Sequence, residues 1–72
     1  MLHLVFSANG IERIKNILRP SDQVVQLSQQ RILLVDTATY LEQGLQEPVG
    51  TIIDTHTLAH IIHNAPAIKS TF

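Results

Sequence analysis

The stretch VGTIIDTHTLAHIIHNAPAIKSTF, residues 49–72, reads as a strand, a helix and a second strand. Residues 49–53 form a short apolar run rich in β-branched side chains, which is typical of a buried strand. Asp54 and Thr55 follow, and their side-chain oxygens can accept hydrogen bonds from the first free N–H groups of a helix. Residues 67–72 can return as a last strand. A strand, a crossover helix and a strand predict a right-handed parallel unit.

The helix in this unit has an apolar stripe and a defined end. Its apolar residues recur with helical spacing at Leu58, Ile61, Ile62 and Ala65. We expect Asn64 and Pro66 to end the helix, because asparagine tolerates a left-handed cap and proline cannot continue the turn.

The residues before this unit also alternate between strands and helices. Apolar runs predict strands over residues 2–6, 23–27 and 31–35. Helices are predicted over residues 11–18 and 38–43. They would begin at Asn9, with Glu12 three residues later in a variant of the capping box, and at Asp36 or Thr37. Gly44 suits the left-handed residue just past the second helix.

This order of elements predicts one α/β domain over residues 1–72. We expect a small three-layer domain, with a mostly parallel sheet of about five strands and helices on both faces. One connection conflicts with this scheme, because residues 28–31 are too few for a parallel crossover of a dozen or more residues. Either the flanking strands form an antiparallel hairpin, or the strand order departs from a simple doubly wound sheet.

The composition indicates that this small domain needs support. A chain of 72 residues has a marginal core, and small domains are often stabilised by disulfides, metals or partner subunits. The chain has no cysteine, which excludes disulfides, thiolate metal sites and any persulfide chemistry of its own. Only 15% of the residues are charged. We therefore expect an oligomer in which protein covers part of the surface.

The charge balance argues against direct nucleic-acid binding. Five Lys plus Arg against six Asp plus Glu give a formal net charge of −1, so a broad basic surface is not expected.

No apolar run approaches the roughly 20 residues of a membrane span. The opening MLHLVFSANG reads as a strand and not as a signal peptide. These features predict a soluble, cytoplasmic protein.

Three histidines on the last helix are the most conspicuous candidates for metal ligands. His56, His60 and His63 fall within roughly 60° of one another on a helical wheel. Imidazoles one turn apart can chelate zinc, nickel or copper. The favoured interpretation is a polar stripe facing solvent or a neighbouring subunit, because no Asp or Glu completes the set. His3 is interpreted as a strand histidine and not as a ligand.

Other polar residues are weaker candidates. The loop of residues 7–10 joins a first strand to a first helix, where anions can meet helix N–H groups, but it lacks a phosphate-binding motif. Asp36 and Asp54 each follow a strand, so paired carboxylates could do acid–base chemistry at one sheet edge. Helix capping is the favoured role for both. Candidate nucleophiles without a supporting motif are Ser7, Ser28 and Ser70. We predict no catalytic, cofactor-binding or metal site.

Several segments resemble the TusB/DsrH family, within the wider DsrE/DsrF/DsrH group of small sulfur-relay proteins. These are the opening Met1-Leu2-His3, SDQVVQL at residues 21–27, LVD at residues 34–36 with YLEQGL at residues 40–45, IDT at residues 53–55 with the helix of residues 58–63, and the aromatic Phe72. The resemblance covers most of the chain. It differs at residues 28–31, where family members usually carry a helix, and in the absence of the cysteine that some relatives use to accept sulfur.

The resemblance implies a DsrEFH-like fold and a role as a non-catalytic subunit of a TusBCD-like complex. Such complexes relay sulfur towards 2-thiolation of the wobble uridine of certain tRNAs. The carrier cysteine would lie on a TusC/TusD-like (DsrF/DsrE-like) sister subunit, and this chain would be an accessory subunit without a cofactor. The alternative is a stand-alone homo-oligomer that binds a small molecule or a metal.

Overall fold

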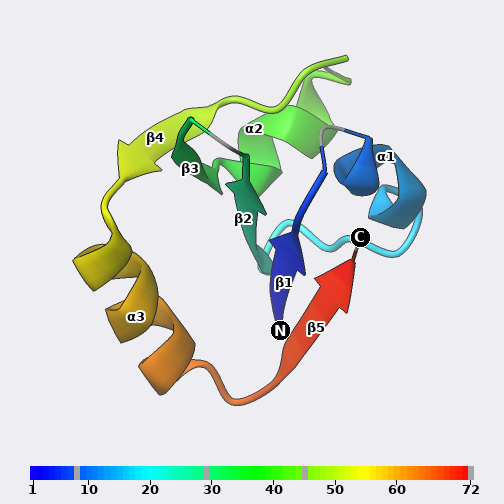
Figure 1. Ribbon diagram of the computed structural model, residues 1–72. Helices are drawn as coiled ribbons and strands as arrows, with labels where there is room; N and C mark the ends of the chain where they lie inside the picture. The colour runs from blue at the N-terminus through cyan, green and yellow to red at the C-terminus, as the bar shows by residue number, and fades with distance from the viewer. Residues whose placement is uncertain (8, 29, 45, 72) are drawn as a thin grey trace.

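The computed structural model describes residues 1–7, 9–28, 30–44 and 46–71. In these residues the chain alternates five strands with three helices (Figure 1). Their bounds are β1 Leu2–Val5, α1 Gly10–Ile14, β2 Gln23–Leu27, β3 Ile32–Val35, α2 Thr37–Glu42, β4 Gly50–Ile53, α3 Thr55–Asn64 and β5 Ile68–Thr71. The structure is therefore a small α/β domain, and the predicted order of elements is confirmed.

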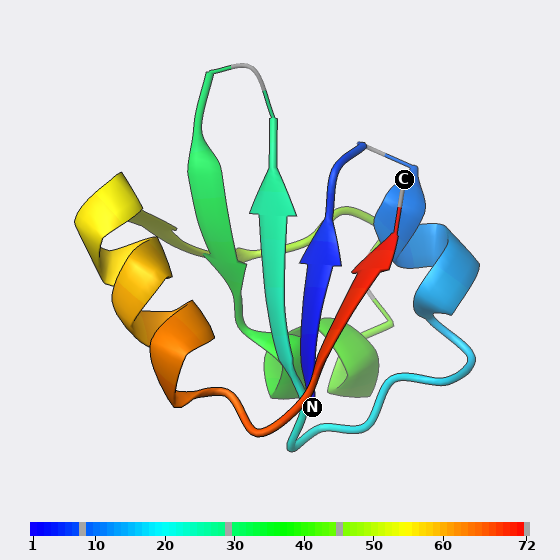
Figure 2. The ribbon, with the colours of Figure 1, turned by 60° about the horizontal axis from the view of Figure 1, so that its bottom comes forward.

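The five strands form one mixed sheet in the order β4-β3-β2-β1-β5. β1 runs parallel to β2 and to β5, whereas β3 runs antiparallel to both β2 and β4. Figure 2 shows β3 pointing against its neighbour β2 and against β1 and β5 beyond it. The prediction of a mostly parallel sheet is wrong, because half of the strand pairings are antiparallel.

The short connection between β2 and β3 explains this departure. It closes an antiparallel hairpin in which Leu27 pairs with Ile32. The backbone N–H of Ser28 donates to the carbonyl of Arg31 at 3.1 Å, and the Ser28 Oγ lies 3.2 Å from the same oxygen. Because four residues can close a hairpin but cannot carry a parallel crossover, the chain must reverse here. This settles the alternatives that the sequence left open in favour of the hairpin.

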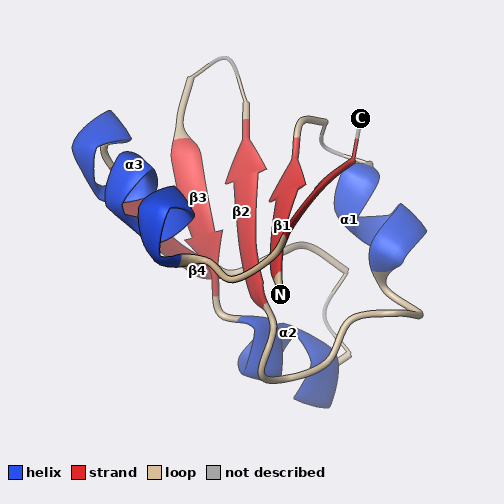
Figure 3. Cartoon of the chain, turned by 90° about the horizontal axis from the view of Figure 1, so that it is seen from below, coloured by secondary structure: helices blue, strands red, loops and turns tan. Residues whose placement is uncertain are grey.

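The last three elements do not form the compact parallel unit that the sequence predicts. β4 and β5 point the same way, but they lie at opposite edges of the sheet with three strands between them. Figure 3 shows the segment after α3 crossing over the sheet to reach β5. β4 and β5 are therefore both edge strands, and each has one unpaired side within the described sheet.

Apolar side chains gather in two clusters on opposite faces of the sheet. Because side chains alternate along a strand, Val5 and Val24 face one way while Leu4 and Val25 face the other. The first cluster includes residues of α1 and α2, among them Ile11 and Tyr40, and the second packs against the apolar stripe of α3. Figure 1 shows α1 and α2 on one side of the strands and α3 on the other. The predicted stripe of α3 is confirmed, since its packed residues are Leu58, Ile61, Ile62 and Ala65.

Burial is concentrated in the first part of the chain. Among the described residues every buried side chain lies between Leu2 and Tyr40, and α3 has no buried residue. Large apolar side chains remain exposed on both edge strands, with Ile52 in β4 at 63% and Ile68 in β5 at 45%. The prediction of a buried strand over residues 49–53 is therefore wrong, because β4 occupies a sheet edge.

The helix ends follow local sequence in α2 and α3 but not in α1. The carboxylates of Asp36 and Asp54 accept hydrogen bonds from the N–H groups of Thr39 and Thr57, at 3.2 and 2.8 Å. Asn9 makes no side-chain capping bond, so the predicted capping box is wrong. α1 ends at Ile14 and continues as tight turns, in which the N–H of Leu18 donates to the Ile14 carbonyl at 3.1 Å.

The residues predicted to end α2 and α3 behave differently. Gly44 takes a positive φ of 60°, as expected after α2. Asn64 does not take the predicted left-handed conformation, because no described residue other than glycine has a positive φ. Its side-chain amide instead donates to the carbonyl of His60 at 2.9 Å, and Ala65 leaves the helix in an extended conformation just before Pro66.

Candidate functional site

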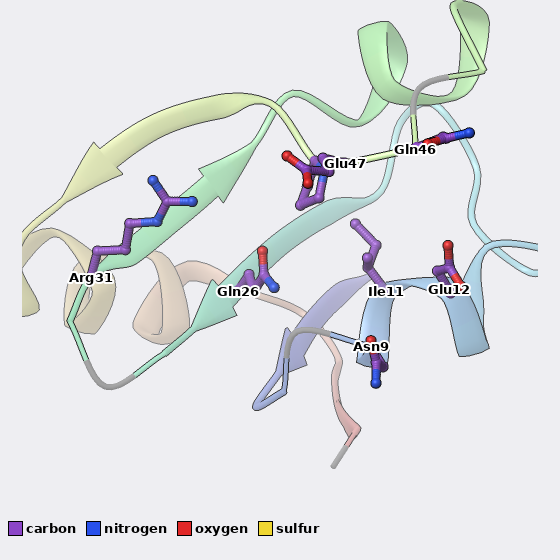
Figure 4. A pocket seen from close by; sticks show the side chains of 8 residues that line it. Asn9, Ile11, Glu12, Gln26, Arg31, Gln46 and Glu47 are labelled. Atoms are coloured by element: carbon purple, nitrogen blue, oxygen red, sulfur yellow. The ribbon is translucent and has the colours of Figure 1, made fainter.

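A polar pocket of about 580 Å³ lies at the ends of β1 and β2 where the chain leaves these parallel strands. Side chains line it from the β1–α1 connection, α1, β2, the residue before β3 and the segment before β4 (Figure 4). They are Asn9, Ile11, Glu12, Gln26, Arg31, Gln46, Glu47 and Pro48. In α/β sheets, ligands commonly bind outside the carboxyl ends of the strands. We call this hollow the hairpin pocket.

The hairpin pocket offers hydrogen bonds and little apolar surface. Asn9, Gln26 and Gln46 supply amides, Arg31 supplies a cation, and Glu12 and Glu47 supply carboxylates. Apart from Ile11, Gln26 and Pro48, the lining residues are exposed. Small-molecule sites are usually mostly apolar with a few polar groups. The lining of this pocket is therefore mostly polar and mostly exposed.

A second hollow of about 400 Å³ surrounds a buried histidine at the other end of β1. Its lining residues are Met1, His3, Ile17, Arg19, Asp22 and Lys69. The His3 side chain is only 3% exposed, and its Nε2 lies 3.4 Å from Oδ2 of Asp22. The His3 Nδ1 is also buried and has no hydrogen-bond partner among the described residues. We call this hollow the His3 pocket.

Asp22 is held by contacts from three directions. The N–H of Arg19 donates to Asp22 Oδ2 at 3.2 Å, and the Met1 amino group lies 3.4 Å from Oδ1. Burial raises the pKa of Asp22, but these donors and His3 outweigh it and lower the pKa below its ordinary value. Asp22 is therefore a carboxylate that joins the start of β2 to β1 and to the end of the α1 segment.

The sequence did not predict the contact between His3 and Asp22. The interpretation of His3 as a strand histidine is confirmed by its place in β1. β1 and β2 are parallel, with His3 opposite Val24, so the residue preceding β2 lies beside the start of β1. A polar residue inside one apolar strand and an acid just before the next parallel strand would have been the available signal.

The three histidines of α3 lie away from the sheet. His56, His60 and His63 are exposed, whereas the residues that pack on the sheet lie on the other side of the helix. No group of three His, Cys, Asp or Glu residues suited to a metal ion occurs among the described residues. The histidine stripe therefore faces the surface, and its use by a partner or a metal shared between chains remains a hypothesis.

The two carboxylates considered for acid–base chemistry are far apart. Asp36 follows β3 and donates its N–H to the carbonyl of Val49, while Asp54 follows Ile53 of β4, which pairs with Ile32 at the start of β3. Because β3 and β4 are antiparallel, the two residues lie at opposite ends of this strand pair, roughly 17 Å apart at about 3.4 Å per residue. The expectation that they share one sheet edge is wrong, and both serve as helix caps.

As far as the structure describes them, the first loop and the candidate serines form no nucleophilic site. Ala8 lies outside the described residues, and α1 begins at Gly10 without a side-chain cap. Ser28 is engaged in the hairpin turn, and Ser70 is exposed in β5.

The hydrogen bond from the Thr57 N–H to the Asp54 carboxylate lowers the pKa of Asp54, which keeps this side chain charged at the start of α3.

Comparisons with known proteins return no relative. No protein-family model, no curated protein and no solved structure matches this chain. Within the residues that the structure describes, no helix has both the length and the hydropathy needed to cross a membrane. The resemblance to the TusB/DsrH family therefore rests on the sequence segments quoted above.

Proposed function

We propose that this chain is a non-catalytic subunit of a TusBCD-like sulfur-relay complex that supports 2-thiolation of the tRNA wobble uridine. The observation that carries the proposal is the unequal burial of the chain, in which the segment from β4 to β5 has apolar side chains and no buried residue. Such a segment is stabilised when another protein covers it. The resemblance to the TusB/DsrH family supplies the type of assembly.

The chemistry of the chain is compatible with an accessory role. It has no cysteine, so it cannot carry a persulfide, and the sulfur would have to travel on a TusC/TusD-like sister subunit. Neither hollow contains a nucleophile held by a general base. The contribution of this subunit is to complete the assembly and to position its partner.

The exposed isoleucines suggest two separate contacts. Ile52 pairs with Leu33 and so faces the α1 side of the sheet, whereas Ile68 pairs with Leu2 and faces the α3 side. β4 and β5 are four strand spacings apart, which is roughly 19 Å. The two residues therefore belong to different surface patches. Contacts at both edges are what a subunit between two sister chains would need.

The finer fold assignment belongs to the same proposal. A DsrEFH-like domain would have three layers, with helices on both faces of its sheet, and the two apolar clusters support this arrangement. The antiparallel β2–β3 hairpin would replace the longer helical connection that family members usually carry. This difference from the family lies at the β2–β3 hairpin, next to the hairpin pocket, and away from the start of β1 and the end of α3.

The test is co-purification. The chain is produced alone and together with DsrE-like and DsrF-like chains encoded beside it, and the mass of each purified sample is measured by light scattering. We expect a defined hetero-oligomer in the second sample. Ile52→Lys and Ile68→Lys should each abolish or weaken it, because a charge at an apolar contact is costly. Ile17→Lys is the matched control, since Ile17 has a similar exposure of 54% and lies just after α1.

Two results would contradict the proposal. The sister chains could fail to co-purify, or the three lysine variants could assemble equally well. A homo-oligomer that ignores the sister chains would instead favour the stand-alone module. The hairpin pocket and the histidine stripe would then be tested with small polar ligands, zinc and nickel, because a ligand that binds only the folded chain raises its melting temperature.

A further inference from the structure

We propose that the His3 pocket binds a small organic carboxylate, with its charged group at Arg19 and Lys69 and its apolar part on Met1 and Ile17. This pocket lies at the end of β1 opposite to the hairpin pocket. Its volume of about 400 Å³ is within the usual range for small-molecule sites.

The charges around the pocket favour a bound anion. Arg19 and Lys69 are two of the five Lys and Arg residues in the chain, and Asp22 is the one acid in the lining. Together with the Met1 amino group that faces Asp22, these groups give a net charge of +2. Lys69 stands beside His3 in the register of β5 on β1, so the strand pairing itself holds this cation at the pocket. An arginine fork can bind a carboxylate through two parallel hydrogen bonds.

Asp22 repels a bound anion less than a carboxylate without partners would. Its oxygens already accept from the Arg19 N–H and face the Met1 amino group and His3. These contacts lower its pKa and neutralise its charge locally. The cationic heads of Arg19 and Lys69 therefore remain available, because Arg19 uses its backbone N–H and not its guanidinium in this contact.

The apolar part of the ligand follows from the rim of the pocket. Met1 and Ile17 are each 54% exposed, and both line this hollow. Exposed apolar side chains beside cationic ones match a molecule with a carboxylate at one end and an apolar group at the other. Inorganic phosphate would satisfy the cations but would leave this apolar surface in water.

The test uses benzoate as the probe and nitrogen–proton correlation spectra of the full chain as the readout. We expect saturable shifts of the amides at Ile17, Arg19, Asp22 and Lys69. Benzamide is the neutral control and should bind about tenfold more weakly, since it lacks the charge. Inorganic phosphate and acetate should also bind more weakly, because neither has the aromatic ring.

Variants locate the site. Arg19→Gln and Lys69→Gln should each weaken benzoate binding several-fold, while the matched variant Arg31→Gln in the hairpin pocket should leave it unchanged. Ile17→Ser should weaken benzoate but not acetate. All four side chains are exposed, so the spectra should show an intact fold. Equal binding of benzoate and benzamide, equal losses in Arg19→Gln and Arg31→Gln, or no saturable shifts would overturn the proposal.

Discussion

The first 43 residues and the segment from Gln46 to Thr71 have similar secondary structure and very different burial. The first part holds β1, β2 and β3 in the middle of the sheet and contributes every buried side chain of the described chain. The second part holds both edge strands and α3, with no buried residue. The burial of an apolar strand therefore depends on its place in the sheet order and not on its sequence alone.

The largest expected difference comes from truncating an isoleucine in each part. Ile11 is 1% exposed inside the first cluster, whereas Ile61 in α3 is only partly buried. Ile11→Ala should lower the free energy of unfolding by about 2–5 kcal/mol. Ile61→Ala should cost about 1–2 kcal/mol, because less apolar surface leaves water there. Urea unfolding of the isolated chain measures both, and equal losses would remove the distinction between the two parts.

Two glycines give a second test of the same comparison. A Cβ at Gly10 would collide with the side chain of Val5, and one at Gly50 would collide with the backbone of Leu34. Gly10→Ala should destabilise the whole domain by about 1–3 kcal/mol, because it overpacks the core.

Gly50→Ala should instead separate β4 from β3 while β1 and β2 stay paired. Amide hydrogen exchange should then rise at Thr51 and Ile53 and remain slow at Leu4 and Val25. Loss of protection across all strands in Gly50→Ala would show that the edge and the centre of the sheet unfold together.

The contact between His3 and Asp22 should make the next largest contribution to the free energy of unfolding. Asp22→Asn should lower the free energy of unfolding by about 1–3 kcal/mol, because buried His3 loses a charged partner. The pKa of Asp22 is lowered in the folded chain. Its stabilisation is therefore present above the ordinary pKa of 3.8 and is lost as the pH falls through the lower folded value. The gap between wild type and variant should close at that pH, and a gap that persists would contradict the assignment.

The helix caps should give the smallest effects. Asp36→Ala removes the cap of α2 beside the core and should cost about 1 kcal/mol. Asp54→Ala removes the cap of α3, and its main effect should be a loss of helical circular dichroism without a matching change in the core. Because the cap also lowers the pKa of Asp54, this helical signal should fall in the wild type as the pH drops through the folded value. A pH-independent helical signal would argue against this cap.

Local features were predictable from the sequence, and long-range ones were not. The caps at Asp36 and Asp54 depend on residues three positions apart, so the chain itself encodes them. Strand direction depends on which neighbours pair, and the single short connection after Ser28 reversed it. The separation of Asp36 from Asp54 follows from the antiparallel pairing of β3 and β4. The contact of His3 with Asp22 follows from the parallel pairing of β1 and β2. Both depend on how strands pair, which local patterns do not give.

The most direct test of the unequal burial and its proposed cause is amide hydrogen exchange on the isolated chain and on the co-purified assembly. The account predicts slow exchange in β1 and β2 in both samples, and exchange in β4, α3 and β5 that is fast alone and slow in the assembly. Equal protection of all five strands in the isolated chain would contradict the account. An assembly in which the amides of β4 and β5 exchange as fast as in the isolated chain would also contradict it.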